Sequence, residues 1–223
     1  MKLSEKTINV LKNFSSINQS IQIKKGKTLK TISPLRTIFV EATIDEDFSE
    51  EFALYDLNKL LAKVSLYKDA DLDFGSDKVS IKDKNKSDYI KYCSPKVIVV
   101  PPEKSISLGS PDCSFSLSKE DLDWMRKSAG ISGSPNFVFE SDGKVVNFIA
   151  TDVKDDAADQ SKIEIAKAED GKKFRVVMKV ENFKLLDGSY DVSIAKKGLA
   201  LFKHKDQNIS YYIAIEAANS TFE

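Results

Sequence analysis

The sequence predicts an α+β protein in which one strand-rich lobe occurs twice. Three observations predict this class. Segments of the first half recur in the same order in the second half, short runs typical of strands outnumber helical runs, and turn residues join neighbouring runs into antiparallel hairpins. The pattern favours antiparallel sheets with two short helices per lobe. Those helices are expected to cover one face of the sheets, because only there are their apolar stripes buried.

The repeat is clearest in a three-strand block that follows a short helical segment. The helical segments are residues 54–61 and 180–186; the strands are 71–74, 78–81 and 88–92 in the first copy and 190–194, 199–202 and 211–215 in the second. The two copies also open alike, with Leu3-Ser4-Glu5-Lys6 and Leu117-Ser118-Lys119-Glu120. A lobe that is present twice is suited to building a symmetric ring.

The first lobe, residues 1–94, is expected to begin with an amphipathic helix over 4–14. Ile8, Leu11 and Phe14 recur there at helical spacing. Strands are predicted at 21–23, 30–32, 37–42 and 52–55, the last as the fourth strand of one sheet. A second helix over 56–65 and the three-strand block complete the lobe.

The second lobe, residues 117–223, repeats this order. Ser118 followed by Asp121 resembles a capping box, so a helix is predicted to run from there to about Ala129. Two hairpins are predicted, from 136–140 to 144–151 across Ser141-Asp142-Gly143, and from 161–167 to 174–180 around Glu169-Asp170-Gly171. A short helix at 181–186 precedes the last three strands.

Residues 95–116 are predicted to link the two lobes. Pro95, Pro101, Pro102 and Pro111 fall within this stretch, and proline punctuates helices and strands. The longest apolar run, Val97–Val100, ends at the second of these prolines and is far too short for a membrane span. No membrane partner is therefore expected.

Composition predicts a globular protein of a reducing compartment. Of the 223 residues 30% are charged and 41% hydrophobic, as in ordinary soluble domains, and the N-terminus carries no apolar signal region. The formal net charge is zero, which argues against a partner held by bulk positive charge. Cys93 and Cys113 lack the spacing of a metal site; a disulfide between them stays open from sequence alone.

The sequence offers no catalytic, metal or cofactor motif, and we expect a non-enzyme. The single histidine, His204, lies in a charged turn and is expected to be solvated rather than part of a catalytic triad. No glycine-rich phosphate loop occurs. The acidic runs 45–47 and 152–159 lack the ligand pattern of a calcium loop and are expected to be solvated.

Basic residues recur on the outward faces of the four predicted helices. They are Lys6 and Lys12; Lys59 and Lys63; Lys119, Arg126 and Lys127; and Lys184. For any one helix, an ordinary solvated face is the simpler interpretation. Because the helices hold equivalent places in a duplicated lobe, we expect them to form one basic surface.

The N-terminal segments Met1–Ser4, Leu11–Phe14 and Ile17-Asn18 resemble those of the DNA polymerase sliding clamps of T-even-type bacteriophages. Residues 54–58 and 212–217 are similar to that family as well. The similarity spans the whole chain, mostly as pattern rather than identity. It implies the duplicated sliding-clamp fold and a head-to-tail homotrimeric ring that encircles duplex DNA and tethers the phage replicative DNA polymerase. The neutral charge departs from the more acidic balance expected of this family.

Such a ring would hold six lobes and twelve helices. Helices about 10 Å apart give a circumference of about 120 Å and, after about 10 Å is subtracted for helix thickness, a hole of about 28 Å. A duplex fits in it with water between. We therefore expect phosphate-directed, sliding contact by the eight basic residues rather than base reading.

The resemblance also implies a subunit joint. In such clamps the last strand before the linker, here 88–93, pairs with an edge strand of the next chain, here 161–167. Exposed strand edges invite this pairing, and Ile90, Tyr92, Ile163 and Ile165 would supply apolar contact. The alternative is that these side chains pack only within their own sheets.

The linker is the expected docking site for partners. Val99, Val100, Ile106 and Leu108 would wall a groove for a short hydrophobic peptide, such as the polymerase C-terminal tail. The clamp loader would use the same groove in turn, and late-transcription factors are further candidates. The alternative is that Ile106 and Leu108 only pin the linker to the sheets.

Two functions therefore remain open from sequence. The first is a clamp without activity of its own, acting on replicating DNA in the cytoplasm of the infected host. The second is a duplicated β-rich structural phage protein, such as a virion component, whose lysines are solubilising. Retention on circular but not on linear DNA separates them.

Overall fold

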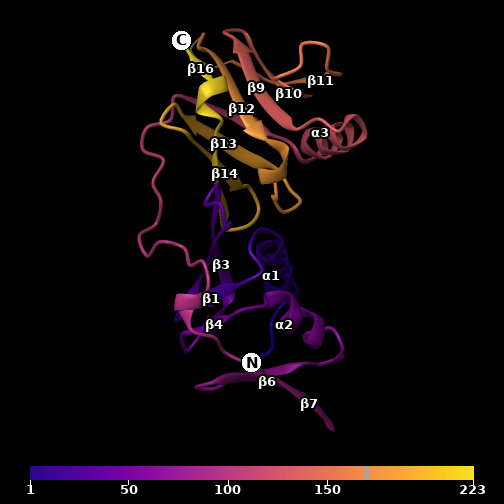
Figure 1. Cartoon of the computed structure of the whole chain (residues 1–223), viewed down its shortest axis with the longest axis vertical. Helices are drawn as coiled ribbons and strands as arrows, with labels where there is room; N and C mark the ends of the chain where they lie inside the picture. The colour runs from indigo at the N-terminus through magenta and orange to yellow at the C-terminus, as the bar shows by residue number, and fades with distance from the viewer. Residues whose placement is uncertain (169–170) are drawn as a thin grey trace. The chain divides into compact units, whose positions relative to one another are not determined.

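The computed structural model describes residues 1–168 and 171–223, and it divides into two compact units, Met1–Lys104 and Ser105–Glu223 (Figure 1). Strands dominate both units, and the pairs described within each unit are antiparallel. The α+β class expected from the sequence is confirmed. No described helix is both long and apolar enough to cross a bilayer.

The first unit combines two helices with three groups of strands. Its elements are α1 (Glu5–Ile17), β1 (Ile21–Ile23), β2 (Gly26–Ile32), β3 (Ile38–Phe48), β4 (Phe52–Leu54), α2 (Leu57–Val64), β5 (Asp71–Phe74), β6 (Lys78–Asp83), β7 (Lys86–Lys91) and a 3-10 turn, η1 (Pro95–Val97). β2 pairs with β3, β1 pairs with β4, and β5, β6 and β7 form a three-stranded sheet in that order. The expectation that 52–55 joins the sheet of 37–42 is wrong, since β4 pairs with β1.

The core of the first unit lies beneath α1 and around an aromatic cluster. Val10, Leu11 and Phe14 are at most 3% exposed and point from α1 into the unit. The ring of Phe52 stacks on Phe74 at 5.1 Å, which ties β4 to β5. This packing holds the two helices against the strands that carry the candidate site.

The second unit combines one α-helix with two sheets. Its elements are β8 (Cys113–Leu117), α3 (Lys119–Ser132), β9 (Asn136–Asp142), β10 (Val145–Thr151), β11 (Ser161–Lys167), β12 (Lys173–Lys179), η2 (Val180–Asn182), β13 (Tyr190–Ala195), β14 (Leu199–His204), β15 (Ile209–Ala214), η3 (Ala217–Asn219) and β16 (Thr221–Phe222). One sheet has the order β11-β10-β9-β12-β16, and β15, β14, β13 and β8 pair in series in the other. Residues 113–116, placed in the linker from sequence, thus begin a strand of this unit.

Aromatic side chains fill the space between these two sheets. The ring of Phe139, on β9, lies 6.2 Å from that of Phe202 on β14. Phe183 lies 5.3 Å from Phe202 and 4.7 Å from Phe137, so a residue between η2 and β13 completes the cluster. Burial of several such rings is a large share of the hydrophobic stabilisation of the unit.

The predicted duplication appears in the strand order. β5, β6 and β7 form an antiparallel meander in the first unit, with Leu72 opposite Ile81. β13, β14 and β15 form the equivalent meander in the second, with Val192 opposite Phe202. The hairpin across Ser141-Asp142-Gly143 is confirmed too. There the Asp142 carboxylate accepts the backbone N–H groups of Lys144 and Val145 at 2.8 and 3.1 Å.

Two other expectations for the second lobe are wrong. Strand 161–167 does not pair with 174–180, because β11 pairs with β10 and β12 pairs with β9. In the turn expected between them, Glu169 and Asp170 lie outside the described residues. The helix expected at 181–186 is only the 3-10 turn η2, which leaves three α-helices in the described chain instead of four.

Candidate nucleic-acid interface and subunit edges

The first unit presents its two helices side by side. Ser4 caps α1, with its hydroxyl accepting the Thr7 backbone N–H at 3.2 Å, and the Glu46 carboxylate accepts the Ser4 backbone N–H at 2.5 Å. Glu46 also accepts the Thr7 hydroxyl proton. An anion at a helix N-terminus is favoured by the helix dipole. These bonds fix the direction of α1 and hence the place of its outward residues.

Lys6 and Lys12 lie exposed on α1, away from its buried stripe. Lys12 also lines a groove of about 550 Å³ between the two helices, to which α2 contributes Leu61 and Val64. No ion pair of Lys6 or Lys12 occurs within the described residues. Both ammonium groups are therefore able to meet an external phosphate.

The two lysines of α2 differ in their surroundings. Asp56 caps this helix by accepting the Lys59 backbone N–H at 3.1 Å, and the Lys59 side chain is exposed. Lys63 is paired with Asp88 on β7, whose carboxylate also accepts the Tyr67 hydroxyl at 2.7 Å. The hydrogen bonds from Lys63 and Tyr67 lower the pKa of Asp88. Lys63 thus joins α2 to the edge strand.

On α3, Lys127 is the exposed basic residue. Lys119 instead pairs with Asp123 at 3.0 Å and with Asp187 at 3.2 Å, and these partners raise its pKa. Ser118 caps the helix by accepting the Asp121 N–H at 3.1 Å, as its capping-box resemblance predicts. Glycine at position 133 ends it in the left-handed conformation.

Arg126 serves the protein's own backbone. Its guanidinium donates to the carbonyl oxygens of Phe183 and Leu185 at 2.9 and 3.0 Å. The Tyr190 hydroxyl donates to the Leu186 carbonyl at 2.5 Å, and the Leu186 N–H donates to the Tyr211 hydroxyl at 3.1 Å. Side chains thus satisfy the backbone groups that a helix would have paired, which explains why no helix forms at 183–186.

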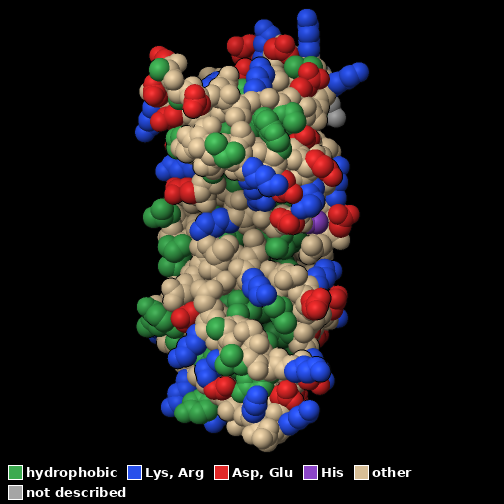
Figure 2. Space-filling model, turned by 90° about the vertical axis from the view of Figure 1, so that its right-hand side faces the viewer, with side chains coloured by type: hydrophobic (Ala, Val, Ile, Leu, Met, Phe, Trp, Pro, Cys, Tyr) green, Lys and Arg blue, Asp and Glu red, His purple; other side chains and the backbone are tan. Residues whose placement is uncertain are grey.

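The eight basic residues therefore divide into two sets. Lys6, Lys12, Lys59 and Lys127 form the exposed set, and Lys63, Lys119 and Arg126 form the engaged set. Lys184 is exposed too, but it has a partner within the chain. Lys184 lies on the irregular segment after η2 rather than on a helix. On the face in Figure 2, Lys and Arg side chains are interspersed with Asp and Glu side chains rather than gathered into one patch.

Among the sheet edges of the described chain, one in each unit corresponds to the joint expected from sequence. β7 is the edge of the three-stranded sheet, and β11 is an edge of the five-stranded sheet. Ile90 on β7 and Ile163 on β11 are both half-buried, with exposed residues before and after them. Ile165 lies at a shift of register between β11 and β10, a bulge of the kind found at sheet edges.

Tyr92 packs inside its own unit. Its ring stacks on Phe52 at 4.7 Å with an angle of 16° between the planes. Burial, with the nearby carboxylates of Asp73 and Asp77, raises the pKa of Tyr92 to about 12. Its hydroxyl is buried without a hydrogen-bond partner among the described residues. Of the four joint residues expected from sequence, Tyr92 is thus the one with a clear role in its own core.

The four docking residues predicted from the sequence are divided between the two units. Val99 and Val100 belong to the first unit, where the Asn18 side-chain amide donates to the carbonyl oxygens of Ile32 and Val99 at 2.9 and 3.3 Å. Ile106 and Leu108 belong to the second unit and are half-buried.

The first part of the linker is also tied to the first unit by charge. Lys24 pairs with Glu103 at 2.9 Å, and Lys30 donates to the Glu103 carbonyl at 3.3 Å. These contacts hold residues 99–103 beside β2.

Leu35 is a candidate docking residue that the sequence analysis missed. It is 80% exposed at the tip of the turn between β2 and β3, where Arg36 has a positive φ of 57°. The Ser33 hydroxyl accepts the N–H groups of Thr37 and Ile38, both at 3.0 Å, so the turn is held firmly. The Pro34-Leu35-Arg36 sequence could have indicated this exposed leucine, because an apolar residue in a proline turn lies at the surface, away from the core.

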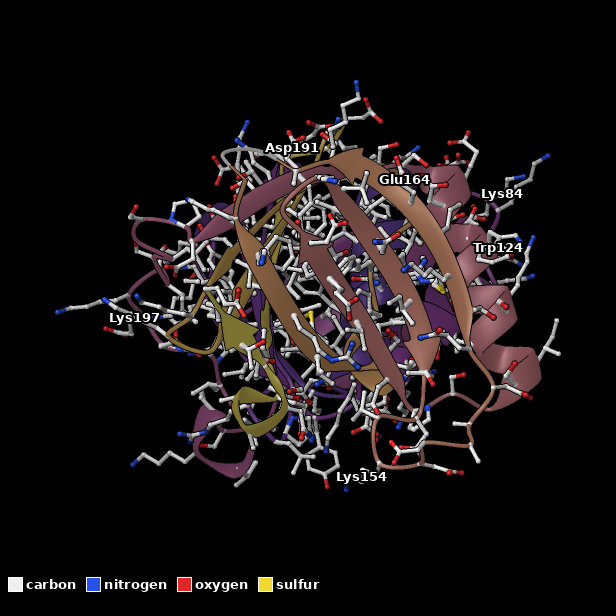
Figure 3. All side chains as sticks on the ribbon, turned by 90° about the horizontal axis from the view of Figure 1, so that it is seen from above. Lys84, Trp124, Lys154, Glu164, Asp191 and Lys197 are labelled. Carbon is white, nitrogen blue, oxygen red and sulfur yellow. The ribbon has the colours of Figure 1, made fainter. Side chains whose placement is uncertain are left out.

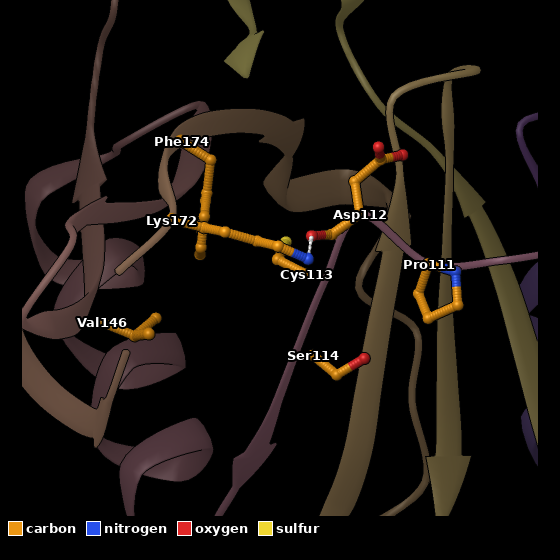
Figure 4. Close-up of a pocket in the computed structure, with 7 residues that line it drawn as sticks. All are labelled: Pro111, Asp112, Cys113, Ser114, Val146, Lys172 and Phe174. Atoms are coloured by element: carbon orange, nitrogen blue, oxygen red, sulfur yellow. Dashed lines mark hydrogen bonds between the residues drawn. The ribbon is translucent and has the colours of Figure 1, made fainter. Parts of the chain in front are cut away.

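A small pocket of about 190 Å³ lies where the second unit begins (Figure 4). Cys113, Val146 and Phe174 line it, and the Lys172 ammonium donates to the Asp112 carbonyl at 3.0 Å across its edge. Burial, with the carboxylate of Asp112, raises the pKa of Cys113 to about 12. The thiol therefore stays protonated and is poorly suited to nucleophilic chemistry.

His204 is buried, so the expectation of a solvated histidine is wrong. It is 4% exposed, and its Nδ1 accepts the backbone N–H groups of Asp206 and Gln207 at 3.0 and 3.2 Å. Nε2 lies 3.0 Å from the Asp187 carbonyl, to which it donates when Nδ1 accepts. The charged neighbours in the sequence indicated an exposed position. In the structure the ring instead joins two loops by hydrogen bonds.

No group of three or more His, Cys, Asp or Glu side chains is placed to hold a metal ion in the part of the chain that the structure describes. The residues gathered here are instead cations on helix faces, half-buried apolar residues on strand edges, and fixed apolar turns. Such an arrangement can bind a polyanion, a second copy of the chain and a peptide.

Comparison with known proteins agrees with this geometry. A family model described as DNA polymerase processivity factor matches residues 2–100. The chain is 32% identical to a sliding clamp of Escherichia phage RB69 over 97% of each chain. It is 30% identical to a sliding clamp of Vibrio phage KVP40, over 97% of this chain and all of that one.

Solved structures share the fold at low identity. A PCNA of A. fulgidus, solved with the C-terminal region of FEN-1, superposes with a TM-score of 0.73 at 14% identity over 96% of each chain. A Helicobacter pylori beta clamp bound to a DNA ligase peptide gives 0.72 at 14% identity, over 96% of this chain and 64% of that one.

Proposed function

Because this chain belongs to the sliding-clamp family of T-even-type bacteriophages, we propose that three copies close head to tail into a ring around duplex DNA. The ring tethers the phage replicative DNA polymerase to the template for processive synthesis. It acts by binding and has no catalytic step of its own. It works on replicating DNA in the cytoplasm of the infected bacterial host.

The observation that carries the ring is the pair of unpaired edges. β7 lies in the first unit and β11 in the second, so each chain offers two different edges. An exposed strand edge carries a row of unpaired backbone N–H and C=O groups. Pairing of β7 with β11 of the next chain would satisfy these groups on both strands. Joining two different surfaces in this heterologous way generates rings or filaments, and rotation by a third of a turn closes at three copies.

The DNA contact rests on the exposed lysines. Lys6, Lys12, Lys59 and Lys127 carry their ammonium groups on helix faces without an ion pair among the described residues. Contacts of this kind are directed at phosphates and are independent of sequence, which suits a ring that must slide. Lys63, Lys119 and Arg126 are assigned structural roles instead.

Partners would dock near the linker of the first unit. Val99 and Val100 lie beside β2, and Leu35 projects from the turn that follows it. These apolar residues on a fixed turn and a tied linker are suited to a hydrophobic peptide, such as the polymerase tail, with the clamp loader and late-transcription factors as further users. That the Helicobacter pylori clamp was solved with a ligase peptide supports this mode of recognition.

Sedimentation equilibrium tests the assembly. The parent protein should sediment at three times the mass of one chain. The variant Ile163→Asp should sediment as a folded monomer, because a carboxylate would be buried at the joint. The matched control is Lys162→Asp, one residue earlier and exposed, which should stay trimeric. A monomeric parent would favour a duplicated structural protein instead.

A further inference from the structure

Trp124, the only tryptophan of the chain, is 47% exposed on α3. The buried stripe of this helix is formed by Leu122, Met125 and Ala129, so Trp124 contributes little to the core of its own unit. Ile131, two turns further on, is 88% exposed. Large apolar side chains that are left open on one flank of a helix are typical of a surface that a partner covers.

The flank that carries Trp124 lies beside the free edge of the second unit. The Ser128 hydroxyl lies 2.6 Å from the Ser161 hydroxyl at the start of β11. Trp124 comes one turn before Ser128 and therefore lies on the same side of the helix. Figure 3 shows Trp124 on the outer side of α3.

The first unit has a matching arrangement at its own free edge. A hollow of about 470 Å³ lies between the start of α2 and β7, and it is lined by Tyr55, Asp56, Lys59, Tyr89, Ile90 and Lys91. The two tyrosines are 65% and 58% exposed. The Lys78 ammonium lies over the Tyr89 ring, 5.2 Å from its centre, so Tyr55 is the more open of the two.

Pairing of the two edges would bring this hollow and Trp124 together. Lys63 of α2 reaches Asp88, so the face of β7 that bears Asp88 and Ile90 is turned toward α2. Ser161 reaches α3, so the face of β11 that bears Ser161 and Ile163 is turned toward α3. If these apolar faces are buried on one side of a continuous sheet, α2 and α3 become neighbours across the joint.

The chemistry of the two surfaces is complementary. On the α2 side of the hollow, an indole would meet the Tyr55 ring, the Lys59 side chain and Ile90, through edge-to-face, cation–π and apolar contact. Glu120 lies exposed one turn before Trp124, and Lys59 and Lys91 line the hollow. An acidic flank would thus meet a basic rim.

We propose that Trp124 of each subunit inserts into the hollow formed by Tyr55, Lys59 and Ile90 of the next subunit and anchors the joint of the ring. This assignment rests on the proposed trimer and adds the side chain that dominates its interface. A single buried aromatic residue commonly carries a large share of the energy of an interface.

Tryptophan fluorescence tests the assignment directly, because no other tryptophan contributes to the signal. Emission and acrylamide quenching are measured while the parent protein is diluted through its trimer-to-monomer transition, which sedimentation velocity follows in parallel. The assignment predicts that Trp124 is shielded and blue-shifted in the trimer and becomes quenchable on dissociation. Equal quenching of trimer and monomer overturns it and leaves the proposed ring intact.

Substitutions provide the second readout. Trp124→Ala and Tyr55→Ala should each raise the concentration of half-dissociation by about 30-fold or more, with unfolding temperatures unchanged in the monomer. The control is Leu35→Ala, an exposed apolar residue in the turn between β2 and β3, which should leave dissociation unchanged. A Trp124→Ala protein that trimerises like the parent refutes the assignment, whereas a parent that never trimerises refutes the proposed function.

Discussion

Arg126 and Lys127 are adjacent in the sequence, carry the same charge and differ in role. The guanidinium of Arg126 donates hydrogen bonds to two backbone carbonyls, whereas the side chain of Lys127 is exposed. Sequence analysis could predict that α3 carries basic residues outside its apolar stripe. It could not separate these two, because the carbonyl acceptors belong to residues nearly sixty positions away.

Arg126→Met should therefore destabilise the protein by about 1 to 3 kcal/mol, because the carbonyl oxygens of Phe183 and Leu185 lose their donors. Lys127→Met should change stability by less than about 0.5 kcal/mol. Urea unfolding monitored by circular dichroism measures both. Equal stabilities of the two variants would contradict the structural role assigned to Arg126.

The same pair makes a prediction for DNA. Lys127→Met should shorten the residence of the loaded ring and reduce the dependence of residence on salt, because one phosphate contact is lost. Arg126→Met, once folded, should retain the residence time of the parent. The opposite ranking would show that Arg126 rather than Lys127 meets the duplex.

His204 also shows a limit of prediction at this scale. Its position between charged residues indicates an exposed side chain, yet its ring packs against Gly188. A Cβ added at Gly188 would lie 2.2 Å from Nε2 of His204. Gly188 has a φ of +148°, which favours glycine as well. Gly188→Ala should thus lower stability by about 3 kcal/mol in thermal unfolding. Gly198→Ala, at a φ of +104° with nothing within 4 Å of the added Cβ, is the control and should cost less.

At the scale of elements, the sequence predicted the features that depend on interactions between neighbouring residues. The cap at Ser118 and the Asp142-Gly143 hairpin follow from nearby hydrogen bonds and are confirmed. The partner of β11 was not predictable in this way, because alternation gives the faces of a strand and not its neighbour. The missing helix after η2 likewise depends on Arg126 and Tyr211, which lie 57 and 25 positions from the groups they contact, as well as on nearby Tyr190.

The attachment of α1 should depend on acid through Glu46. Burial raises the pKa of Glu46, but hydrogen bonds from Ser4 and Thr7 together bring it below its ordinary value of 4.5. A lowered folded pKa means that the stabilisation is present above the unfolded pKa and is lost as pH falls through the folded one. Glu46→Gln should cost about 1 kcal/mol at pH 7 and flatten the stability profile below about pH 5. Thermal unfolding from pH 3 to 7 measures this, and a parallel profile in the variant would contradict it.

Tyr92 is a poor position for a variant meant to open the joint. Tyr92→Asp would damage the first unit itself, because the ring stacks on Phe52. Tyr92→Phe should instead leave assembly unchanged and raise stability by up to about 1 kcal/mol, since a buried hydroxyl without a partner in the described chain is removed. Unfolding of the variant by urea measures this, and a loss of stability would show that the hydroxyl is satisfied.

At the scale of the whole molecule, the duplicated fold was predictable, whereas the pore stays a prediction. Repeated blocks with the same strand order indicate two similar lobes without any contact being known. The estimate of about 28 Å for the hole assumed four helices per chain. The described chain has three α-helices, and at the fourth position an irregular segment bears Lys184. Fewer of the eight basic residues are accordingly left for DNA than the sequence predicts.

The central claim is topological: the chain holds DNA by surrounding it. The measurement that tests it most directly is retention on DNA after loading by the clamp loader, followed on nicked circles before and after a single restriction cut. A ring should stay on the circle for long times and leave rapidly once an end exists, at the same salt concentration. Triple reversal of Lys6, Lys12 and Lys127 to Glu should weaken loading while leaving the trimer intact. Equal retention of the parent protein on circular and linearised DNA would contradict the account.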